Sequence, residues 1–197
     1  DMERYRKGLE MKTGWKIMLA RTPAESSAQT FAIKDLVSPT YNKYAKTVVK
    51  GDIGEAAAIV KGKRDLPLYY SNGTHTYVGA NIPFGKKLDI EHKFFPILSG
   101  GNIFHAWLGE SASDPEALYK LTQRIARHSQ IGYFSYTKDL TVCGNCRSTT
   151  GGLNEHCPSC GSDNVRWWSR ITGYYSDVTA WNEGKRQELK DRYRFSV

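Results

Sequence analysis

The pattern of apolar and polar positions along the chain predicts short helices and short strands in mixed order. Helical periodicity and polar caps predict helices over residues 1–12, 52–64, 114–128 and 183–194. Short apolar runs predict strands over residues 17–20, 66–70 and 132–137, and a further strand after the Gly100-Gly101 turn within residues 94–110. The sequence has no internal repeats and no low-complexity tracts, so it predicts a mixed α and β chain.

A polar turn leads from the strand predicted at residues 17–20 into a helix. Residues 22–28 read TPAESSA, and Pro23 is favourable in the first turn of a helix. Free N–H groups at a helix start, the Ser26 and Ser27 hydroxyls and the positive end of the helix dipole are suited to hold a phosphate. Junctions of this kind are common, so the turn by itself does not define a phosphate site.

Composition and charge are those of an ordinary globular chain with an uneven distribution of basic residues. The 197 residues are 40% hydrophobic and 24% charged, which disfavours disorder. No apolar run approaches the ~20 residues of a membrane span, and no basic-then-apolar leader is present, so we expect a cytoplasmic protein. The net charge of +8 divides into +5 over residues 1–70, +2 over 71–138 and +1 over 139–197. The basic N-terminal third suits an anionic partner such as a nucleotide or nucleic acid, and a solvated surface accounts for it equally well.

All four cysteines of the chain lie close together, as Cys143-x-x-Cys146 and Cys157-x-x-Cys160. Two tight turns that each carry two thiolates can close a tetrahedron around one Zn²⁺ at about 2.3 Å per bond. A pair of disulfides is the alternative, and the lack of a secretory signal disfavours it. A four-thiolate site has no open position, so the zinc of this zinc ribbon is expected to be structural.

Two histidines occupy segments where a functional role has to be weighed. His75 lies in a polar turn at residues 71–75 and could be a ligand or an acid-base group, but a lone loop histidine is usually a surface or hydrogen-bonding residue. His105 alternates with large apolar residues along its strand, which predicts a core residue with satisfied hydrogen bonds. Neither histidine is assigned a catalytic role.

The segment after the cysteines contains a glycine among aromatic and basic residues. Residues 170–175 read RITGYY, with Gly173 at the fourth position, and residues 181–189 read WNEGKRQEL. A lone glycine in such a setting usually marks a bulge or a close-packed site. This tail nevertheless resembles the C-terminal tail of anaerobic (class III) ribonucleotide reductases, in which a four-cysteine zinc ribbon precedes a loop whose glycine carries a stable backbone radical. Residues 22–27, 70–75 and 100–110 also resemble stretches of these enzymes, so the resemblance covers essentially the whole chain.

The resemblance implies a fold and a division of the chain. The expected fold is α/β, the C-terminal part of a ten-stranded α/β barrel of the glycyl radical enzyme type, with a zinc ribbon and a C-terminal radical loop. Residues 1–138 would form part of the catalytic barrel, residues 139–165 the zinc ribbon, and residues 166–197 the glycyl radical loop and C-terminal helix.

The resemblance also implies an activity, the anaerobic reduction of ribonucleotides, expected to be triphosphates, to deoxyribonucleotides for DNA replication. A separate radical S-adenosylmethionine activase would remove a hydrogen atom from Gly173, and the glycyl radical would then generate a thiyl radical on a cysteine. A Cα radical is stabilised when its nitrogen and carbonyl become coplanar with it, and a side chain would crowd that arrangement. Formate or a thiol system would be the reductant, and the complete enzyme is expected to be a homodimer.

Under the resemblance, the turn at residues 22–28 gains a specific role. Ser26, Ser27 and Ala28 would bind the substrate phosphates. Glu25 would be an active-site carboxylate near the ribose, poised for proton transfer or hydrogen bonding. An acid in the first turn of a helix is also favoured by the helix dipole, so both interpretations of Glu25 stay open.

The chain departs from the family in its cysteines. The thiyl cysteine and the second catalytic cysteine have no counterpart, because all four cysteines belong to the predicted zinc ribbon. We therefore expect the chain to be the C-terminal portion of a longer reductase, either a fragment or one subunit of a split enzyme, whose N-terminal part supplies these cysteines.

Two other classes of protein fit parts of the sequence. A zinc-ribbon nucleic-acid-binding module would use Trp167 and Trp168 beside Arg166 and Arg170 as a base-stacking platform, but residues 139–197 carry a net charge of only +1. A glycyl-radical spare-part subunit would keep the radical loop and would not need the turn at residues 22–27.

Overall fold

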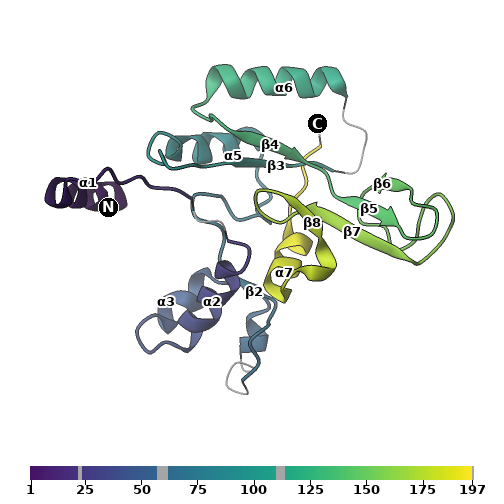
Figure 1. Cartoon of the computed structure of the whole chain (residues 1–197), viewed down its shortest axis with the longest axis horizontal. Helices are drawn as coiled ribbons and strands as arrows, with labels where there is room; N and C mark the ends of the chain where they lie inside the picture. Colours follow the sequence, from purple (N-terminus) through teal and green to yellow (C-terminus); the bar gives the residue numbers. More distant parts are fainter. Residues whose placement is uncertain (22–23, 57–61, 110–113, 197) are drawn as a thin grey trace.

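The structure is a computed structural model, which describes residues 1–21, 24–56, 62–109 and 114–196. The molecule is elongated, with short strands along its middle, α6 above them, and α2 and α3 below (Figure 1). The α-helices are α1 (Met2–Thr13), α2 (Ser27–Val37), α3 (Asn42–Val48), α5 (Phe84–Glu91), α6 (Pro115–His128) and α7 (Glu183–Asp191). Short 3₁₀ turns are η1 (Ile53–Ala56), η2 (His92–Phe94) and η3 (Val178–Ala180).

The strands of the described residues form three small sheets. They are β1 (Lys50–Gly51), β2 (Leu68–Tyr69), β3 (Phe104–Trp107), β4 (Phe134–Thr137), β5 (Leu140–Cys143), β6 (Thr149–Gly151), β7 (Val165–Arg170) and β8 (Tyr175–Asp177). Strands β1 and β2 pair antiparallel, β3 and β4 pair parallel, and the largest sheet is antiparallel with the order β6-β5-β7-β8. This last sheet contains strands from both the expected ribbon segment and the expected radical-loop segment, so the two segments share one backbone hydrogen-bond network.

The parallel pair β3-β4 is joined through α6, because parallel neighbours require a crossover connection. Phe104 and Ala106 on β3 pack with Ile125 of α6 in one apolar cluster. Since side chains alternate across a strand, His105 and Trp107 lie on the opposite face of β3. The fold therefore presents one apolar face of β3 to α6 and directs a histidine and a tryptophan toward the functional region described below.

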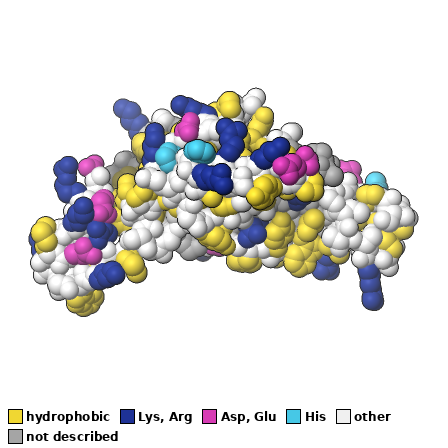
Figure 2. All heavy atoms as spheres, turned by 90° about the horizontal axis from the view of Figure 1, so that it is seen from above, with side chains coloured by type: hydrophobic (Ala, Val, Ile, Leu, Met, Phe, Trp, Pro, Cys, Tyr) yellow, Lys and Arg dark blue, Asp and Glu magenta, His cyan; other side chains and the backbone are white. Residues whose placement is uncertain are grey.

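Helix α6 is amphipathic, and its outer face is basic. Asp114, the first residue of the helix predicted over residues 114–128, caps α6, since its side chain accepts a hydrogen bond from the Glu116 N–H at 3.1 Å. A shallow surface pocket on the outer face is lined by Lys120, Gln123, Arg124, Arg127 and His128. Figure 2 looks down on this side of the molecule and shows Lys, Arg and His side chains gathered along it. Among the described helices, none has the length and apolar character of a membrane span.

The C-terminal end of the chain differs from its prediction. The helix expected over residues 183–194 ends at Asp191. Beyond it the chain is extended and returns to β3, where the Phe195 N–H donates to the Trp107 carbonyl at 2.8 Å and the Gly109 N–H donates to the Phe195 carbonyl at 3.0 Å. These long-range backbone bonds compete with continuation of the helix, and local periodicity does not contain them.

Two other sequence-based expectations also need revision. The buried strand predicted at residues 17–20 is wrong: only Ala20 forms an isolated bridge, with Gly101, and Met18 is 56% exposed. No apolar layer among the described residues covers this segment. The helix predicted over residues 52–64 is described only as the 3₁₀ turn η1, and residues 57–61 lie outside the described part of the chain.

Candidate functional site

A cavity of about 540 Å³ brings together two residues that sequence reasoning had assigned to different segments. Glu25 lines it from the turn before α2, and Gly173 lines it from the β7-β8 hairpin. Arg21, Tyr133 and Thr172 also line this cavity. The cavity therefore juxtaposes an acid, an arginine and a solvent-accessible backbone Cα.

Gly173 lies at the tip of the hairpin between β7 and β8. The Ile171 N–H donates to the Tyr174 carbonyl at 3.0 Å and closes the loop that contains Gly173. A Cβ built on Gly173 would meet no described atom within 4 Å, and the φ of Gly173 lies outside the left-handed region. Neither close packing nor backbone conformation within the described chain requires glycine at this position, which disfavours the bulge or close-packing interpretation.

The predicted phosphate residues stand at a helix start, as expected, but outside the cavity. Helix α2 begins at Ser27 with Ser26 as its N-cap, and the Ser26 side chain makes no capping hydrogen bond. Ser26 is exposed and Ala28 is buried. Pro23 lies outside the described residues. The Glu25 carbonyl accepts a hydrogen bond from Asn182 Nδ2 at 3.0 Å, so the N-cap of α7 fixes this turn.

A buried polar cluster extends from the cavity wall into the protein. The Arg21 guanidinium contacts His75 Nε2, and His75 Nδ1 lies 3.6 Å from Glu91 Oε2. The other carboxylate oxygen of Glu91 pairs with Lys87. Burial, followed by the charge of Arg21, holds the pKa of His75 well below its usual value, so this histidine is neutral at pH 7. His75 is thus a hydrogen-bonding residue, as the sequence had suggested. Its side chain is only 5% exposed, so it is not a surface residue.

His105 lies beside this cluster and has only one of its two ring nitrogens satisfied. Its ring is 5.3 Å from the His75 ring and stacks on Trp107 at 4.9 Å. Nδ1 lies 3.3 Å from Ser135 Oγ, whereas Nε2 is buried without a partner among the described residues. Burial, with the nearby arginines, lowers the pKa of His105 to about 2. The core location is confirmed, and the expectation of full hydrogen bonding is wrong for Nε2.

A second ionic cluster joins α7 to the hairpin. We refer to Lys185, Glu188 and Arg192 as the C-terminal ion cluster; their side chains are at most 2% exposed. Glu188 accepts from Lys185 at 2.6 Å and from Arg192 at 3.2 Å. Arg192 also donates to Ser169 Oγ at 2.9 Å, and its guanidinium lies 3.9 Å from the Trp107 ring centre. Glu188 and Arg192 are four residues apart, a helical spacing that favours an ion pair, but nothing in the local sequence indicates the burial of this pair.

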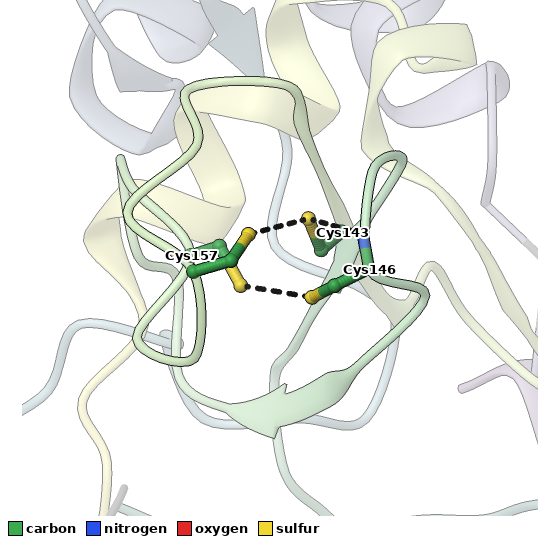
Figure 3. A group of neighbouring side chains, drawn as sticks. Cys143, Cys146 and Cys157 are labelled. Carbon is green, nitrogen blue, oxygen red and sulfur yellow. Dashed lines mark hydrogen bonds between the residues drawn. The ribbon is translucent and has the colours of Figure 1, made fainter.

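The four cysteines meet at one end of the antiparallel sheet. Their sulfur atoms all lie within 4.8 Å of one another, with separations of 3.7 Å for Cys143–Cys160 and 3.6 Å for Cys146–Cys157. A tetrahedron with Zn–S bonds of about 2.3 Å has S···S edges of about 3.8 Å, so the cluster fits a zinc ion. Figure 3 shows Cys143, Cys146 and Cys157 directed toward a common centre. All four cysteines are free thiols, so the disulfide alternative is not supported.

Hydrogen bonds within the cysteine turns shift the thiols in opposite directions. They lower the pKa of Cys146 and Cys157, whereas the pKa of Cys160 is raised to about 12, because the lowering hydrogen bond from the Ser162 backbone is outweighed by hydrogen bonds with the neighbouring thiols. The Asn145 N–H donates to Cys143 Sγ at 3.3 Å, and Ser148 Oγ lies 3.3 Å from Cys157 Sγ. The Ser148 hydroxyl is the main cause that lowers the pKa of the Cys157 thiol to about 6. Thiolates are the form that binds metal, and the surroundings of Cys146 and Cys157 favour that form.

The fold and the cysteine cluster define a mixed α/β chain in which four clustered sulfur atoms fit a metal ion. A family model described as anaerobic ribonucleoside-triphosphate reductase matches residues 1–195. The chain therefore belongs to the anaerobic ribonucleoside-triphosphate reductase family, and the family resemblance noted in the sequence is confirmed.

Relatives of this family are longer than the chain. The anaerobic ribonucleoside-triphosphate reductases of Haemophilus influenzae and Escherichia coli are each 24% identical to it, over 196 and 207 aligned residues. The alignments cover 94% and 98% of this chain but 24% and 26% of these relatives. The chain thus spans about a quarter of the length of the curated relatives it matches.

Solved structures share the fold. An anaerobic ribonucleotide reductase gives a TM-score of 0.69 at 23% identity, covering 99% of this chain and 27% of that one. The Thermotoga maritima anaerobic ribonucleotide reductase in complex with dATP and CTP gives a TM-score of 0.63 at 24% identity, covering 94% and 26%. The mixed α/β fold expected from the resemblance is confirmed by this similarity of fold.

Proposed function

We propose that the chain is the radical-bearing, C-terminal portion of an anaerobic reductase that converts ribonucleoside triphosphates to deoxyribonucleotides. The observation that carries the proposal is the position of Gly173. It lies in an open hairpin anchored by the four-cysteine sheet, and it lines a cavity together with Glu25. Family membership supports the reaction class.

The hydrogen at the Gly173 Cα is the atom that reacts in the first step. A carbon-centred radical generated from S-adenosylmethionine by a separate activase takes this hydrogen atom, which forms a C–H bond on the activase side and leaves one unpaired electron on Gly173. The electron is delocalised over the flanking nitrogen and carbonyl. The open surroundings of Gly173 support access by a second protein, because the residue is exposed.

The later steps need groups from another part of the enzyme. All four cysteines of the chain belong to the cluster, so the thiyl cysteine and the second catalytic cysteine belong to an N-terminal part or partner. The glycyl radical takes the hydrogen of that thiol, and the resulting thiyl radical takes the ribose 3′ hydrogen before the 2′-hydroxyl leaves as water. Formate or a thiol system supplies the reducing electrons.

Within this scheme, the turn at the start of α2 binds the substrate. Ser26, Ser27 and Ala28 hold the phosphates at the N-terminus of an 11-residue helix, whose dipole favours negative charge. Glu25 lines the same cavity as Gly173 and acts near the ribose as a proton acceptor or hydrogen-bond acceptor.

The zinc has a structural role in this proposal. Cys143, Cys146, Cys157 and Cys160 hold Zn²⁺, which when bound cross-links the turns at the ends of β5 and β7. Strand β7 leads directly into the Gly173 hairpin, so the ribbon (residues 139–165) positions the radical loop and C-terminal helix (residues 166–197). Residues 1–138 contribute to a ten-stranded barrel that the rest of the enzyme completes.

Exposed apolar residues support assembly with further protein. Helix α1 has no buried residue and extends away from the rest of the chain (Figure 1). Met11 and Trp15 are 83% and 76% exposed. Such surfaces mark contact sites. We assign this one to the N-terminal part of the reductase, and by resemblance the complete enzyme forms a homodimer.

Oxygen exposure provides the test of this proposed function. After anaerobic activation of the complete reductase, air should cut the backbone at Gly173 and release a C-terminal fragment detectable by mass spectrometry. The unactivated protein, handled identically, is the control. An intact chain after activation that was verified by electron paramagnetic resonance would contradict the assignment of the radical to Gly173.

The two alternative classes receive less support. Trp167 packs against the cluster of Ile171, Val178, Trp181 and Leu189, and its Nε1 donates to the Asn154 carbonyl at 2.9 Å, so it does not offer a free stacking face. A spare-part subunit is disfavoured because the family match extends over residues 1–195 rather than over the tail alone.

A further inference from the structure

The guanidinium of Arg170 contacts the carbonyl that adjoins the Gly173 Cα. Arg170 is the last residue of β7, and its Nη1 donates a hydrogen bond to the Gly173 carbonyl oxygen at 2.6 Å. Strand register pairs Arg170 with Tyr175 on β8, and the guanidinium lies 5.1 Å from the centre of the Tyr175 ring. The side chain thus spans the hairpin and ends on the one carbonyl through which a Gly173 radical would be delocalised.

No acid competes for this arginine within the described part of the chain. The ion pairs there include none to Arg170, whereas Arg166 on the same strand pairs with Asp177 at 3.4 Å. The Nε atom of Arg170 is buried and has no partner among the described residues. The positive charge of Arg170 is therefore directed at a neutral carbonyl, which becomes the acceptor of a charge-assisted hydrogen bond.

The backbone of Arg170 is itself fixed. Its carbonyl accepts a hydrogen bond from Arg192 Nη2 at 3.0 Å, and Arg192 belongs to the buried C-terminal ion cluster. Arg192, the residue that follows α7, therefore holds the end of β7, and the Arg170 side chain holds the hairpin tip. This arrangement joins a well-packed region to the exposed loop that contains Gly173.

We propose that Arg170 is a positioning residue for the Gly173 radical. This inference rests on the proposed function. A Cα radical draws electron density from its amide nitrogen toward its carbonyl, and a positive donor on the carbonyl oxygen favours that displacement. The same hydrogen bond restrains the Gly173 peptide plane, which keeps the nitrogen, Cα and carbonyl coplanar once hydrogen has been removed.

The test compares Arg170→Gln and Arg170→Lys with Arg166→Gln in the complete reductase. Arg166→Gln is the matched control, because it removes an exposed guanidinium from the same strand that does not touch Gly173. Each protein is labelled with ¹³C at the glycine carbonyls, activated anaerobically with the activase and S-adenosylmethionine, and measured by electron paramagnetic resonance. Zinc content and hydrogen exchange of β7 and β8 amides report whether the hairpin is intact.

We expect Arg170→Gln to lower the radical per chain about tenfold, because a charge-assisted hydrogen bond is lost, and to change the carbonyl ¹³C hyperfine coupling. Arg170→Lys, which keeps a positive donor, should give a higher radical yield than Arg170→Gln, and Arg166→Gln should match wild type. A purely structural role would not alter the carbonyl coupling of the radicals that do form.

An unchanged yield and coupling in Arg170→Gln would overturn the inference. If hydrogen exchange shows that Arg170→Gln disturbs the hairpin, the radical yield of Arg170→Lys becomes the test. A yield above that of Arg170→Gln supports the inference, and a yield no better than that of Arg170→Gln overturns it. Absence of a glycyl signal in the wild-type enzyme would instead refute the proposed function, so the two failures are distinguishable.

Discussion

Replacement of Gly173 by alanine separates a chemical requirement for glycine from a structural one. The added Cβ would meet no described atom within 4 Å, and the backbone φ lies outside the left-handed region. At such a position Gly→Ala stabilises a protein by about 0.4–1 kcal/mol, because alanine restricts the unfolded chain. Amides of β7 and β8 should accordingly exchange with solvent at the same rate as in wild type, or up to about fivefold more slowly.

Gly184 provides the matched control in the same tail. A Cβ at Gly184 would lie 2.5 Å from the Leu68 carbonyl oxygen, so α7 has to move away from β2 to accommodate it. Overpacking of this kind costs about 1–3 kcal/mol. Gly184→Ala should therefore speed exchange in α7 and β2 by at least about fivefold, in contrast to Gly173→Ala.

The assay combines hydrogen exchange with electron paramagnetic resonance on the complete reductase after activation. Gly173→Ala should retain zinc and hairpin protection but give no glycyl doublet. Faster exchange in β7 and β8 would refute the structural reasoning, because it would mean that glycine is needed for packing. A persistent doublet would place the radical on another residue.

Three further outcomes follow from the buried charges and the cysteine cluster. Glu188→Gln leaves two buried cations without their acid and should destabilise α7 by about 3–5 kcal/mol. Glu183→Gln, which removes one partner of a surface ion pair, should cost at most about 1 kcal/mol. Urea titration compares the free energies of unfolding of the two variants. His75 and His105 stay neutral in the folded protein, because the pKa of His105 is lowered to about 2 and that of His75 is lowered well below its usual value. Below pH 6.5 the unfolded chain therefore binds more protons than the folded chain. The free energy of unfolding falls as the pH falls. The loss between pH 6.5 and 5 should reach up to about 2.7 kcal/mol per pH unit, and His105→Gln should roughly halve it; equal urea midpoints at both pH values would contradict the neutral-histidine assignment. Zinc chelation should loosen the tail and abolish activation while it preserves most far-UV circular dichroism, and global unfolding would contradict a local role for the ribbon.

Local sequence was sufficient to predict the features that depend on residues close together in the chain. The two Cys-x-x-Cys turns predicted one four-sulfur site, and the structure brings the four sulfurs within 4.8 Å of one another. The caps at Asp114 and Asn182 were likewise predictable, because a capping side chain bonds to an N–H only two or three residues away. The start of a helix near Ser26 was predictable from local sequence in the same way.

Tertiary structure decided the features that depend on segments distant in the chain. It brought Glu25 and Gly173 to one cavity and left Ser26 outside it. It placed His75 against Arg21 and Glu91, and this burial and charge set its pKa, which no local pattern encodes. Residues 17–20 look apolar enough for a buried strand, yet burial requires a second layer, and the described chain does not provide one. Periodicity and spacing act over a few residues, whereas burial, ion pairing and cavity shape arise only when separate segments pack together.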